Sequence, residues 1–469
     1  GNDSIYGGAG NDIINAGASD LLNNDIIDGG AGTDTLTYAA TSIADESVFG
    51  GLTNVEKIKP LGGNIAGMTL TMNGNIGPKI IDASDDSNLT LNLKAGVTDA
   101  ITVALGSDVG SNDDNVVNGG AGYANTDLTV TALDADALDS TTLITGGTGT
   151  DTITITNVGG GTANLTAATS IDVLNLIDYT TGADVIVTAG TNALTAMTVN
   201  ATTMDAGETL NFDGNNSTGA LTINSGEGAD SLDGGTVNDT IYGNGGIDVI
   251  DGQENSATYG ADAIYGGAGN DIINVSTAET EFSNSSTTAL VTDTVDGGAG
   301  TDTLAFNDAA ASLTKAELAN ISNIEKLTLY TGSTIVLSDD FLTNNPGVSI
   351  TLVAGTISAG AGTTADPTIT LALNYIAGNG AIKATGGTAD DTFGTASGAL
   401  IDVSDTLDGG AGTDTINVYN DSGFGTAATR SIGDSVTLAL DVYHTNIENV
   451  TIVDSADDDN AGDVTVTIA

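Results

Sequence analysis

The chain has 469 residues and a formal net charge of -54 at pH 7, because 62 acidic residues stand against 8 basic ones. Such a chain has no basic patch to neutralise phosphates, which excludes nucleic acid as an expected partner. Disorder is also disfavoured, because 39% of the residues are hydrophobic and only four are proline, enough apolar content for a buried core.

Two further features of the composition bear on the core and on ions. Cysteine is absent, which excludes disulfides and thiolate metal sites, and tryptophan is absent too, so the expected core is aliphatic. Only ten of the acids are Glu, and the shorter Asp suits turns and ion ligands better than helix surfaces. Since so much like charge opposes compaction, we expect divalent cations to neutralise it, and the repeat regions to loosen in a chelator.

From its first residues the chain carries a nine-residue pattern, G-G-x-G-x-D-x-U-x, in which U is a large aliphatic residue. GGAGNDIIN begins at Gly7 after a half-motif at residues 3–6, and GGAGTDTLT begins at Gly29 after a half-motif at residues 25–28. A glycine-rich hexad that ends in Asp, followed by a triplet with one buried aliphatic residue, predicts half a coil of a calcium-binding parallel β-roll. Further copies begin at Gly146, Gly297 and Gly409, and weaker ones at Gly119 and Gly386.

The densest array lies at residues 225–274, where five nonads are interrupted by one five-residue insertion. Glycine allows left-handed turns that aim several carbonyl oxygens at one point, and the Asp adds a carboxylate. Calcium takes roughly six to eight oxygens at about 2.3 to 2.6 Å, which two stacked turns can supply and one cannot. The alternative is that these are ordinary β-turns, which need Gly and Asp for backbone reasons alone.

With two nonads in each coil, turns eighteen residues apart should lie on the same side. We therefore expect the Ser225 turn to stack on the Gly243 turn, and the insertion then places the Ala257 turn over Gly234 and the Gly266 turn over Gly243. We predict calcium between these pairs, with five side-chain ligands: Asp230, Asp239, Asp248, Asp262 and Asp271.

A second, longer period follows four of the nonads. The motif reads NVEKI at residues 54–58, NIEKLTL at 323–329, NIENVTI at 446–452 and, more loosely, SIDVL at 170–174. The unit is thus a calcium turn, a variable excursion and a strand that opens with N-I-E. Two roles are open for its Glu, calcium ligand and hydrogen-bonding residue at the end of a rung, and the second is favoured.

Runs of alternating Val, Ile, Leu and Thr predict strands at residues 68–72, 89–93, 101–105 and 350–353. The clearest helix is expected at residues 313–320, where Thr314 and Glu317 have capping-box spacing. The fold class is therefore all-β, a calcium-binding parallel β-roll or β-solenoid with irregular strand-rich rungs that bury a continuous aliphatic interior. We divide the chain, with approximate boundaries, into residues 1–60, 61–145, 146–224, the central array 225–300, and 301–469.

Catalytic motifs are missing from the sequence. There is no H-E-x-x-H and no G-x-S-x-G, and His444, the only histidine, is expected to be a surface or rung residue. Adjacent acids at residues 85–86 and 339–340 are expected by chance in a chain so rich in Asp. The cluster at residues 457–459 resembles the opening of an EF-hand, but Ala461 breaks it, so it counts as a surface ion site only. No enzyme is predicted.

The nonads resemble those of the RTX (repeats-in-toxin) family, and the longer unit, GGAGTDTL followed by N-I-E, resembles RTX-type bacterial surface-layer proteins. The resemblance implies type I secretion, calcium-driven folding outside the cell and assembly into a two-dimensional lattice. It also implies that the sixth residue of each nonad binds calcium with neighbouring glycine carbonyls. These residues are Asp12, Asp34, Asp151, Asp230, Asp239, Asp248, Asp271, Asp302 and Asp414.

The predicted ligand set includes further residues. It takes in Asp262 of the central array, the half-motif acids Asp3, Asp25, Asp293 and Asp405, Asp391 of a weak copy, and the glycines Gly7, Gly8, Gly10, Gly29, Gly30 and Gly32. Two nonads depart from the pattern, because Val237 replaces the glycine at position four in one and Asn244 the glycine at position two in another. These departures put the carbonyl geometry of both turns in doubt.

The function expected from all this is that of a secreted structural protein that assembles with itself into a bacterial surface layer or filament. Sites with affinities of about 0.1 to 1 mM would be empty in the cytosol and filled outside the cell. No membrane-spanning run or signal peptide is visible in the sequence. Contact with cell-surface polysaccharide would use a region not present here. The alternatives are an adhesin stalk, whose ligand is bound by a domain elsewhere, and the C-terminal part of a secreted enzyme.

Overall fold

The computed structural model describes most of the chain in separate stretches. They are residues 2–17, 25–39, 42–43, 50–60, 68–72, 79–84, 89–94, 96–106, 115–119, 127–156, 161–177, 184–189, 196–252, 261–275, 293–306, 312–313, 318–329, 333–337, 339–346, 348–352, 355–359, 370–373, 382–385, 392–395, 406–419, 436–440, 444–453 and 464–468. Contacts divide the chain into two compact units, Gly1–Gly246 and Ile247–Ala469. The finer division into five parts stays a prediction.

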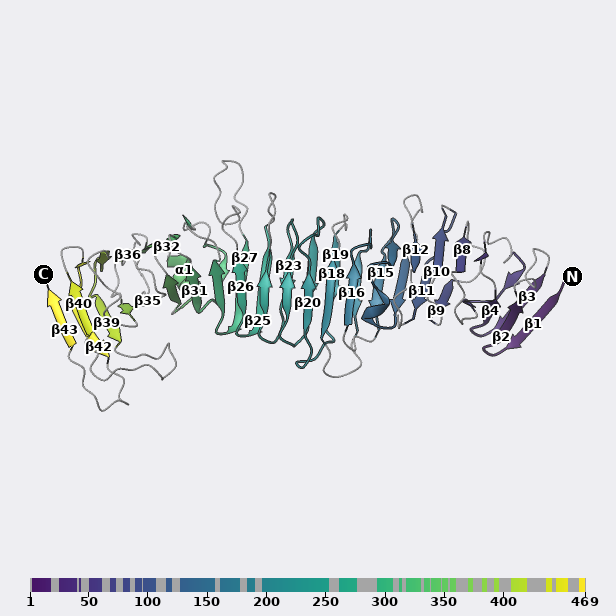
Figure 1. Ribbon diagram of the computed structural model, residues 1–469, viewed down its shortest axis with the longest axis horizontal. Coiled ribbons are helices and arrows are strands. Elements are labelled where there is room, and N and C mark those ends of the chain that lie inside the picture. Colours follow the sequence, from purple (N-terminus) through teal and green to yellow (C-terminus); the bar gives the residue numbers. More distant parts are fainter. Residues whose placement is uncertain are drawn as a thin grey trace. The chain divides into compact units, whose positions relative to one another are not determined.

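In the first unit, each strand pairs with a parallel strand one coil away (Figure 1). One sheet runs through β2 (Ile13–Gly17), β4 (Thr35–Ala39), β7 (Lys57–Pro60), β9 (Ile80–Ala83), β11 (Ile101–Leu105), β13 (Leu128–Ala132), β15 (Thr152–Ile155), β17 (Val173–Leu176), β19 (Met197–Asn200), β21 (Leu221–Asn224) and β23 (Thr240–Tyr242). The other sheets are β1 (Ser4–Ala9), β3 (Ile26–Ala31) and β6 (Leu52–Thr53); β5 (Ser42–Ile43), β8 (Met68–Met72), β10 (Leu89–Leu93), β12 (Val116–Asn118) and β14 (Leu143–Thr145); and β16 (Gly161–Leu165), β18 (Val185–Ala189), β20 (Leu210–Asp213) and β22 (Ser231–Asp233).

The second unit has the same parallel stacking. Its sheets contain β24 (Val249–Asp251), β26 (Ile272–Val275), β28 (Thr303–Phe306), β31 (Lys326–Leu329) and β33 (Ser349–Leu352); β25 (Ala263–Gly269), β27 (Thr294–Gly300) and β30 (Ile321–Ser322); β29 (Ser312–Leu313), β32 (Ser333–Leu337), β34 (Gly355–Ala359), β36 (Ile382–Thr385), β38 (Thr406–Asp408) and β41 (His444–Thr445); β35 (Thr370–Leu373), β37 (Thr392–Thr395), β39 (Thr415–Tyr419) and β42 (Asn449–Val453); and β40 (Val436–Leu440) and β43 (Val464–Ile468). The chain is thus a β-solenoid, as the repeats predict.

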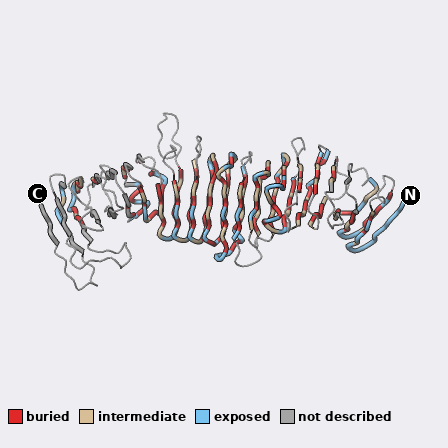
Figure 2. Tube along the Cα trace, viewed as in Figure 1, coloured by how far each residue is buried: buried red, intermediate tan, exposed pale blue. Residues whose placement is uncertain are grey.

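Along many of the described strands, buried and more exposed residues alternate, which separates the core from the surface (Figure 2). In β11, Ile101, Val103 and Leu105 are buried, whereas Thr102 and Ala104 are half-exposed. Because parallel strands keep one register, Val103 lies against Val130 of the next coil, and aliphatic side chains form continuous columns. Each such fully buried side chain stabilises the fold by roughly 1.5 to 3 kcal/mol.

The predicted strands are confirmed, and the predicted helix is wrong. Residues 68–72, 89–93 and 101–105 are β8, β10 and β11, and the fourth run overlaps β33. At the expected helix, residues 312–313 form β29, residues 318–320 form a turn, and residues 314–317 lie outside the described residues. Leu313 is buried opposite Ile335, because pairing along the solenoid outweighs a short helix that would be marginal by itself.

Helix is scarce in the described parts of the chain. A 3-10 turn covers Ala135–Ala137, and α1 covers Asp339–Asn344. The described helices are all too short to cross a membrane. The acid pair at residues 339–340 therefore begins a helix, and His444 lies in β41, a rung of the solenoid, as expected.

Candidate metal centres

Glycine-rich hexads from successive coils lie directly on one another. In the first unit, hexad 7–12 stacks on hexad 29–34 with Gly8 paired to Gly30, and the Gly10 N–H donates to the Ala31 carbonyl at 2.8 Å. In the second unit, hexad 266–271 stacks on hexad 297–302 in the same register. Both stacks therefore bring together the two turns that a calcium cage requires.

Glycine is required at the second and fourth positions of these hexads for two reasons. In hexad 29–34, Gly30 and Gly32 have φ values of 101° and 147°, which residues with a Cβ rarely adopt. A Cβ at Gly30 would also collide with the Gly8 carbonyl oxygen. We use "open turn" for a hexad whose second and fourth residues both have positive φ. Open turns begin at Gly7, Gly29, Gly243, Gly266, Gly297 and Gly409.

The sixth-position Asp residues form a hydrogen-bonded ladder along the coils. The Asp12 N–H donates to Asp34 Oδ1 at 2.7 Å, and the Asp271 N–H donates to Asp302 Oδ1 at 2.8 Å. One carboxylate oxygen of each lower Asp is thereby satisfied in a charge-assisted bond. Asp248 donates to Asp271 in the same way at 2.9 Å.

In four of the open turns, the second carboxylate oxygen of the Asp is buried and has no hydrogen bond. This is the case for Oδ2 of Asp12, Asp34, Asp271 and Asp302. A buried, unpartnered carboxylate oxygen is costly, so each of these atoms indicates a missing positive partner.

Carbonyl oxygens of the next coil approach the same place. A Cβ on Gly266 would lie 2.6 Å both from Asp271 Oδ2 and from the Gly297 carbonyl oxygen, and a Cβ on Gly7 would lie 2.7 Å from Asp12 Oδ2 and collide with the Gly29 carbonyl. Among the described residues, no three carboxylate, histidine or cysteine side chains converge on one point. The donors are therefore carboxylate and carbonyl oxygens together, the set that fits calcium.

In three other hexads, the Asp carboxylate accepts a hydrogen bond from its own turn. In the turns that begin at Gly146, Ser225 and Gly234, the second residue donates its N–H to Oδ2 of the turn's own Asp. The distances are 2.5 Å for Gly147 to Asp151, 3.2 Å for Gly226 to Asp230 and 2.5 Å for Gly235 to Asp239. No second or fourth residue of these three turns has positive φ. We call them closed turns, and both carboxylate oxygens in each have a backbone donor.

The two departures from the nonad pattern have opposite outcomes. Asn244 adopts a φ of 61° and keeps its turn open, because Asn tolerates the left-handed region. Val237 is β-branched and does not, and its turn is closed. The doubt about carbonyl geometry is thus resolved in favour of the Asn244 turn and against the Val237 turn.

Burial without a cation disfavours the charged form of these carboxyl groups. Desolvation raises the pKa of Asp239, Asp293 and Asp302 to about 6, although backbone hydrogen bonds act to lower it. Desolvation likewise raises the pKa of Asp151, Asp230 and Asp271. A bound cation would reverse this shift, since its charge favours the carboxylate.

The half-motif acids occupy equivalent positions. The Asp3 N–H donates to Asp25 Oδ1 at 2.8 Å, and the Asp262 N–H donates to Asp293 Oδ1 at 2.8 Å. Asp25, Asp262 and Asp293 are buried, whereas Asp3 is exposed. Two predicted ligands, Asp391 and Asp405, lie outside the described residues. Asp414 is buried in its open turn.

Of the predicted stacks, one is shown in full. The Ser225 N–H donates to the Tyr242 carbonyl at 3.0 Å and the Gly245 N–H to the Gly226 carbonyl at 3.3 Å, so the Ser225 turn lies on the Gly243 turn. The Asp248 N–H bond to Asp271 Oδ1 and the pairing of Val249 with Ile272 place the Gly266 turn beside the Asp248 end of the Gly243 turn, as predicted. Most of the Ala257 turn lies outside the described residues, so its pairing with the Gly234 turn stays a prediction.

Sequence reasoning missed neutral residues that take the place of Asp. Asn345, which is buried, accepts the Ile324 N–H at 2.8 Å through Oδ1 and donates from Nδ2 to the carbonyls of Ile321 and Phe341. Asn115 accepts the Leu89 N–H at 3.0 Å. Neither residue lies in a glycine-rich hexad, so only the spacing of one coil could have indicated this role.

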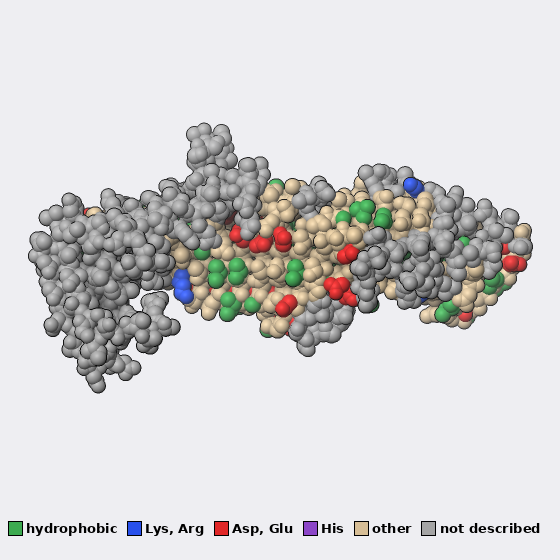
Figure 3. All heavy atoms as spheres, in the orientation of Figure 1, with side chains coloured by type: hydrophobic (Ala, Val, Ile, Leu, Met, Phe, Trp, Pro, Cys, Tyr) green, Lys and Arg blue, Asp and Glu red, His purple; other side chains and the backbone are tan. Residues whose placement is uncertain are grey.

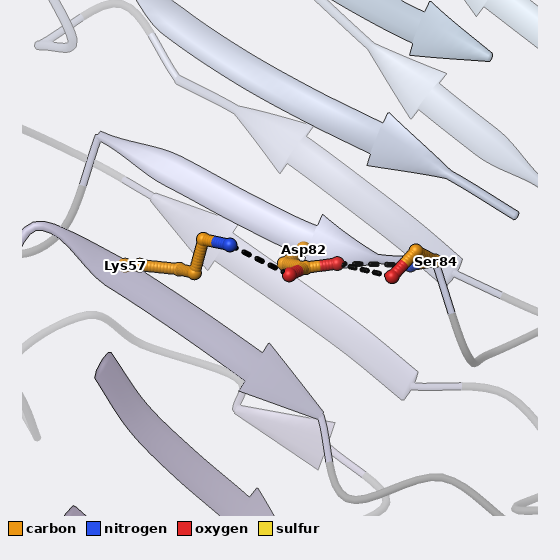
Figure 4. A network of polar contacts seen from close by, with 3 residues as sticks. All are labelled: Lys57, Asp82 and Ser84. Carbon is orange, nitrogen blue, oxygen red and sulfur yellow. Dashed lines mark hydrogen bonds and ion pairs between the residues drawn. The ribbon is translucent and has the colours of Figure 1, made fainter. Parts of the chain in front are cut away.

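A separate polar network lies outside the turns (Figure 4). Lys57 Nζ lies 2.8 Å from Asp82 Oδ2, and the Ser84 N–H and hydroxyl donate to Asp82 Oδ1. Burial acts to raise the pKa of Asp82, but the bonds from Lys57 and Ser84 outweigh it and hold that pKa below its ordinary value. With its oxygens paired in this way, Asp82 joins β7 to β9.

These observations define the class of protein: a β-solenoid whose stacked turns are built to bind calcium. The surface agrees, since Figure 3 shows acidic side chains in small groups on the face in view, with only isolated Lys or Arg among the described residues. A comparison with curated proteins gave no match.

The family comparison specifies the repeats. A family model described as the RTX calcium-binding nonapeptide repeat (4 copies) matches residues 1–20, 22–40, 222–255, 256–276, 292–307 and 404–422. The matched segments are therefore similar to RTX nonapeptide repeats, a kind of repeat that binds calcium. The matched segments contain all the open turns together with the closed turns at Ser225 and Gly234.

Proposed function

We propose that this protein is a secreted structural protein, a calcium-stabilised β-solenoid that assembles with itself into a bacterial surface layer or extracellular filament. Its role is mechanical and not enzymatic. The observation that carries the proposal is the set of buried, unpartnered Asp oxygens in stacked turns of a chain with a net charge of -54. Proteins with RTX repeats are typically secreted, which agrees with this role.

Calcium, when bound, supplies the positive charge that the stacked carboxylates lack. The chain itself orients these oxygens. The hydrogen bond from the Asp271 N–H to Asp302 Oδ1 fixes the carboxylate and leaves Oδ2 facing the Gly297 side of the turn. Weak sites of about 0.1 to 1 mM affinity fill only outside the cell. Binding to the folded state alone stabilises it by mass action, so folding and export become coupled.

A surface for self-assembly is available on the first unit. The outward positions of β11, β13, β15, β17, β19, β21 and β23 carry no charge, although the chain as a whole is strongly acidic. Thr129 pairs there with Thr152 and Thr131 with Thr154, and Asn200 donates to Asn175 at 3.0 Å. A neutral face lets a second copy approach without the repulsion that the acidic turns would produce.

Electron microscopy of the purified chain at 5 mM calcium, with a matched sample in EGTA, tests the proposal. Ordered sheets or filaments in calcium alone are the expected result. Isolated rods in calcium would contradict self-assembly and support an adhesin stalk instead. A matched pair of variants locates the contact: Thr152→Lys places a charge on the neutral face and should reduce assembly, whereas Thr162→Lys, on β16, should not.

A further inference from the structure

Three hexads in open turns are followed, one coil later, by a turn of only three residues. Hexad 29–34 lies over residues 54–56, because Asp28 pairs with Thr53 before the turn and Thr35 pairs with Lys57 after it. Hexad 297–302 lies over residues 323–325 in the same way. Hexad 409–414 lies over residues 446–448. Each short turn has the sequence N-x-E.

The Asn of the short turn reproduces the position of a hexad glycine. Asn54 and Asn323 have φ values of 52° and 55°, and each donates its side-chain amide to an Asp at the end of the preceding coil, Asp28 at 2.8 Å and Asp296 at 2.7 Å. A Cβ on Gly29 would collide with the Asn54 carbonyl oxygen, as a Cβ on Gly7 would collide with the Gly29 carbonyl. The carbonyl oxygen thus faces the turn above it in both cases.

The Glu of the short turn reproduces the position of the hexad Asp. The Asp34 N–H donates to Glu56 Oε2 at 2.8 Å, as the Asp12 N–H donates to Asp34 Oδ1, and the Asp302 N–H donates to Glu325 Oε2 at 2.8 Å. A longer side chain is needed because three residues replace six. The favoured role for this Glu, a hydrogen bond at the end of a rung, is therefore present in the structure.

In the Asp above each of these Glu residues, the second carboxylate oxygen has no hydrogen-bond partner. Oδ2 of Asp34 and of Asp302 belongs to a fully buried residue, 0% exposed in both cases, and has no hydrogen bond. A Cβ on Gly29 would lie 2.6 Å from Asp34 Oδ2, on the side where the Asn54 carbonyl approaches. Asp34 Oδ2 and the Asn54 carbonyl oxygen thus both lie close to Gly29, and the Glu56 carboxylate is bonded to the N–H of the same Asp. Carboxylate and carbonyl oxygens are the ligands that a hard divalent cation takes.

A fourth copy of the short turn shows that the turn alone is not sufficient. Residues 170–172 lie under hexad 146–151, Ser170 has a φ of 55°, and the Asp151 N–H donates to Asp172 Oδ2 at 2.8 Å. Here, however, Asp151 Oδ2 accepts the Gly147 N–H at 2.5 Å, so the turn is closed. The same short turn therefore lies beneath a carboxylate that needs no ion.

We propose that the N-x-E turns complete mixed calcium cages at the last hexad of a stack. One cage joins Asp34 Oδ2, the Asn54 carbonyl and the Glu56 carboxylate, and the second joins Asp302 Oδ2, the Asn323 carbonyl and the Glu325 carboxylate. The short turns lack the second and fourth hexad positions, so they supply fewer carbonyls, and water completes the shell. These cages bind more weakly than those between two hexads. The inference rests on the proposed calcium-dependent fold.

The test is isothermal titration of the full chain with calcium, comparing wild type with the double variant Glu56→Gln, Glu325→Gln. Gln keeps an oxygen for the Asp N–H and removes the charge, so the fold is retained, which circular dichroism checks. The expected result is at least a tenfold loss of affinity at two of the weaker ions. Asp172→Asn is the matched control, because its turn lies under the closed hexad, and its titration should equal that of wild type.

Each outcome has one meaning. Unchanged stoichiometry and affinity in the double variant overturn the mixed cages while leaving the hexad cages intact. Equal losses in the double variant and in Asp172→Asn also overturn them, because the effect would then be one of general charge. A wild-type chain that binds no calcium contradicts the proposed function itself.

Discussion

Open and closed turns share almost one sequence and solve one electrostatic problem in two ways. GGAGTD at residues 29–34 is open, whereas GGTGTD at residues 146–151, which differs at a single position, is closed. In the closed turn the Gly147 N–H occupies the second carboxylate oxygen, and in the open turn that oxygen of Asp34 is left for an ion. The comparison teaches that a nonad match identifies a turn, and that the partner of Oδ2 decides whether the turn depends on calcium.

The difference has an energetic consequence. A buried polar group without a partner costs roughly 1 to 3 kcal/mol, and more when it is charged. Several open turns in one stack add such costs until an ion offsets them. Closed turns carry no such penalty, so their coils should stay folded when calcium is removed.

The largest expected effect comes from adding a side chain at a glycine of an open turn. Gly298→Ala places a Cβ where φ is 95° and where the Gly267 carbonyl oxygen already lies, so we expect a loss of about 3 kcal/mol in stability. Chemical denaturation in calcium measures it. Gly207→Ala is the control, because a Cβ there meets no atom within 4 Å. Equal stability of the two variants would show that open turns do not need their glycines.

A smaller effect is expected when a neutral turn is given a charge. Asn345→Asp removes the amide that donates to Ile321 and Phe341 and buries a carboxylate against their carbonyls, at a cost of roughly 2 to 3 kcal/mol. Added calcium should not restore the loss, since this turn lacks the open geometry. The exposed residue Asn211 provides the control, Asn211→Asp, with a change near zero. Restoration by calcium would break the distinction between the turns.

Removing one carboxylate from each class sharpens the comparison. Asp271→Asn in an open turn should reduce stability by roughly 1 to 3 kcal/mol in calcium and have little effect in EGTA. Asp239→Asn, in a closed turn, places a side-chain NH2 group opposite the Gly235 N–H and should reduce stability by a similar amount in both buffers. Thermal melts of both variants in both buffers provide the four values. A calcium-dependent loss in Asp239→Asn would contradict the assignment of that turn as closed.

The pH dependence of the calcium-free chain is the mildest effect. Because the folded-state pKa values of Asp239, Asp293 and Asp302 are raised to about 6, the folded chain binds protons more tightly than the unfolded one. These three groups therefore stabilise the calcium-free chain as pH falls from about 6 towards 4 and destabilise it as pH rises through 6. Melting temperatures in EGTA at pH 5 and pH 7.5 test this. A lower melting temperature at pH 5 would contradict it.

Much of this could be predicted from the sequence, and the limits are physical. The alternation of large aliphatic residues with Thr, Asn or Ala predicted β8, β10 and β11, and the spacing of the hexads predicted that the Ser225 turn stacks on the Gly243 turn. The helix at residues 313–320 was wrong because pairing of Leu313 with Ile335 outweighs a local capping signal. Open and closed turns could not be told apart at residues 146–151, since all the pattern glycines are present and the choice depends on neighbouring coils.

Hydrogen exchange of the full chain, followed by mass spectrometry in 1 mM calcium and in EGTA, tests the central claim most directly. Open-turn coils, residues 4–17, 25–39, 263–275 and 293–306, should lose protection at least tenfold in EGTA, while coils with closed turns, residues 197–242, keep theirs. Because all these regions belong to one chain, their protection is compared within a single sample. Equal protection of all these regions with and without calcium would contradict the account.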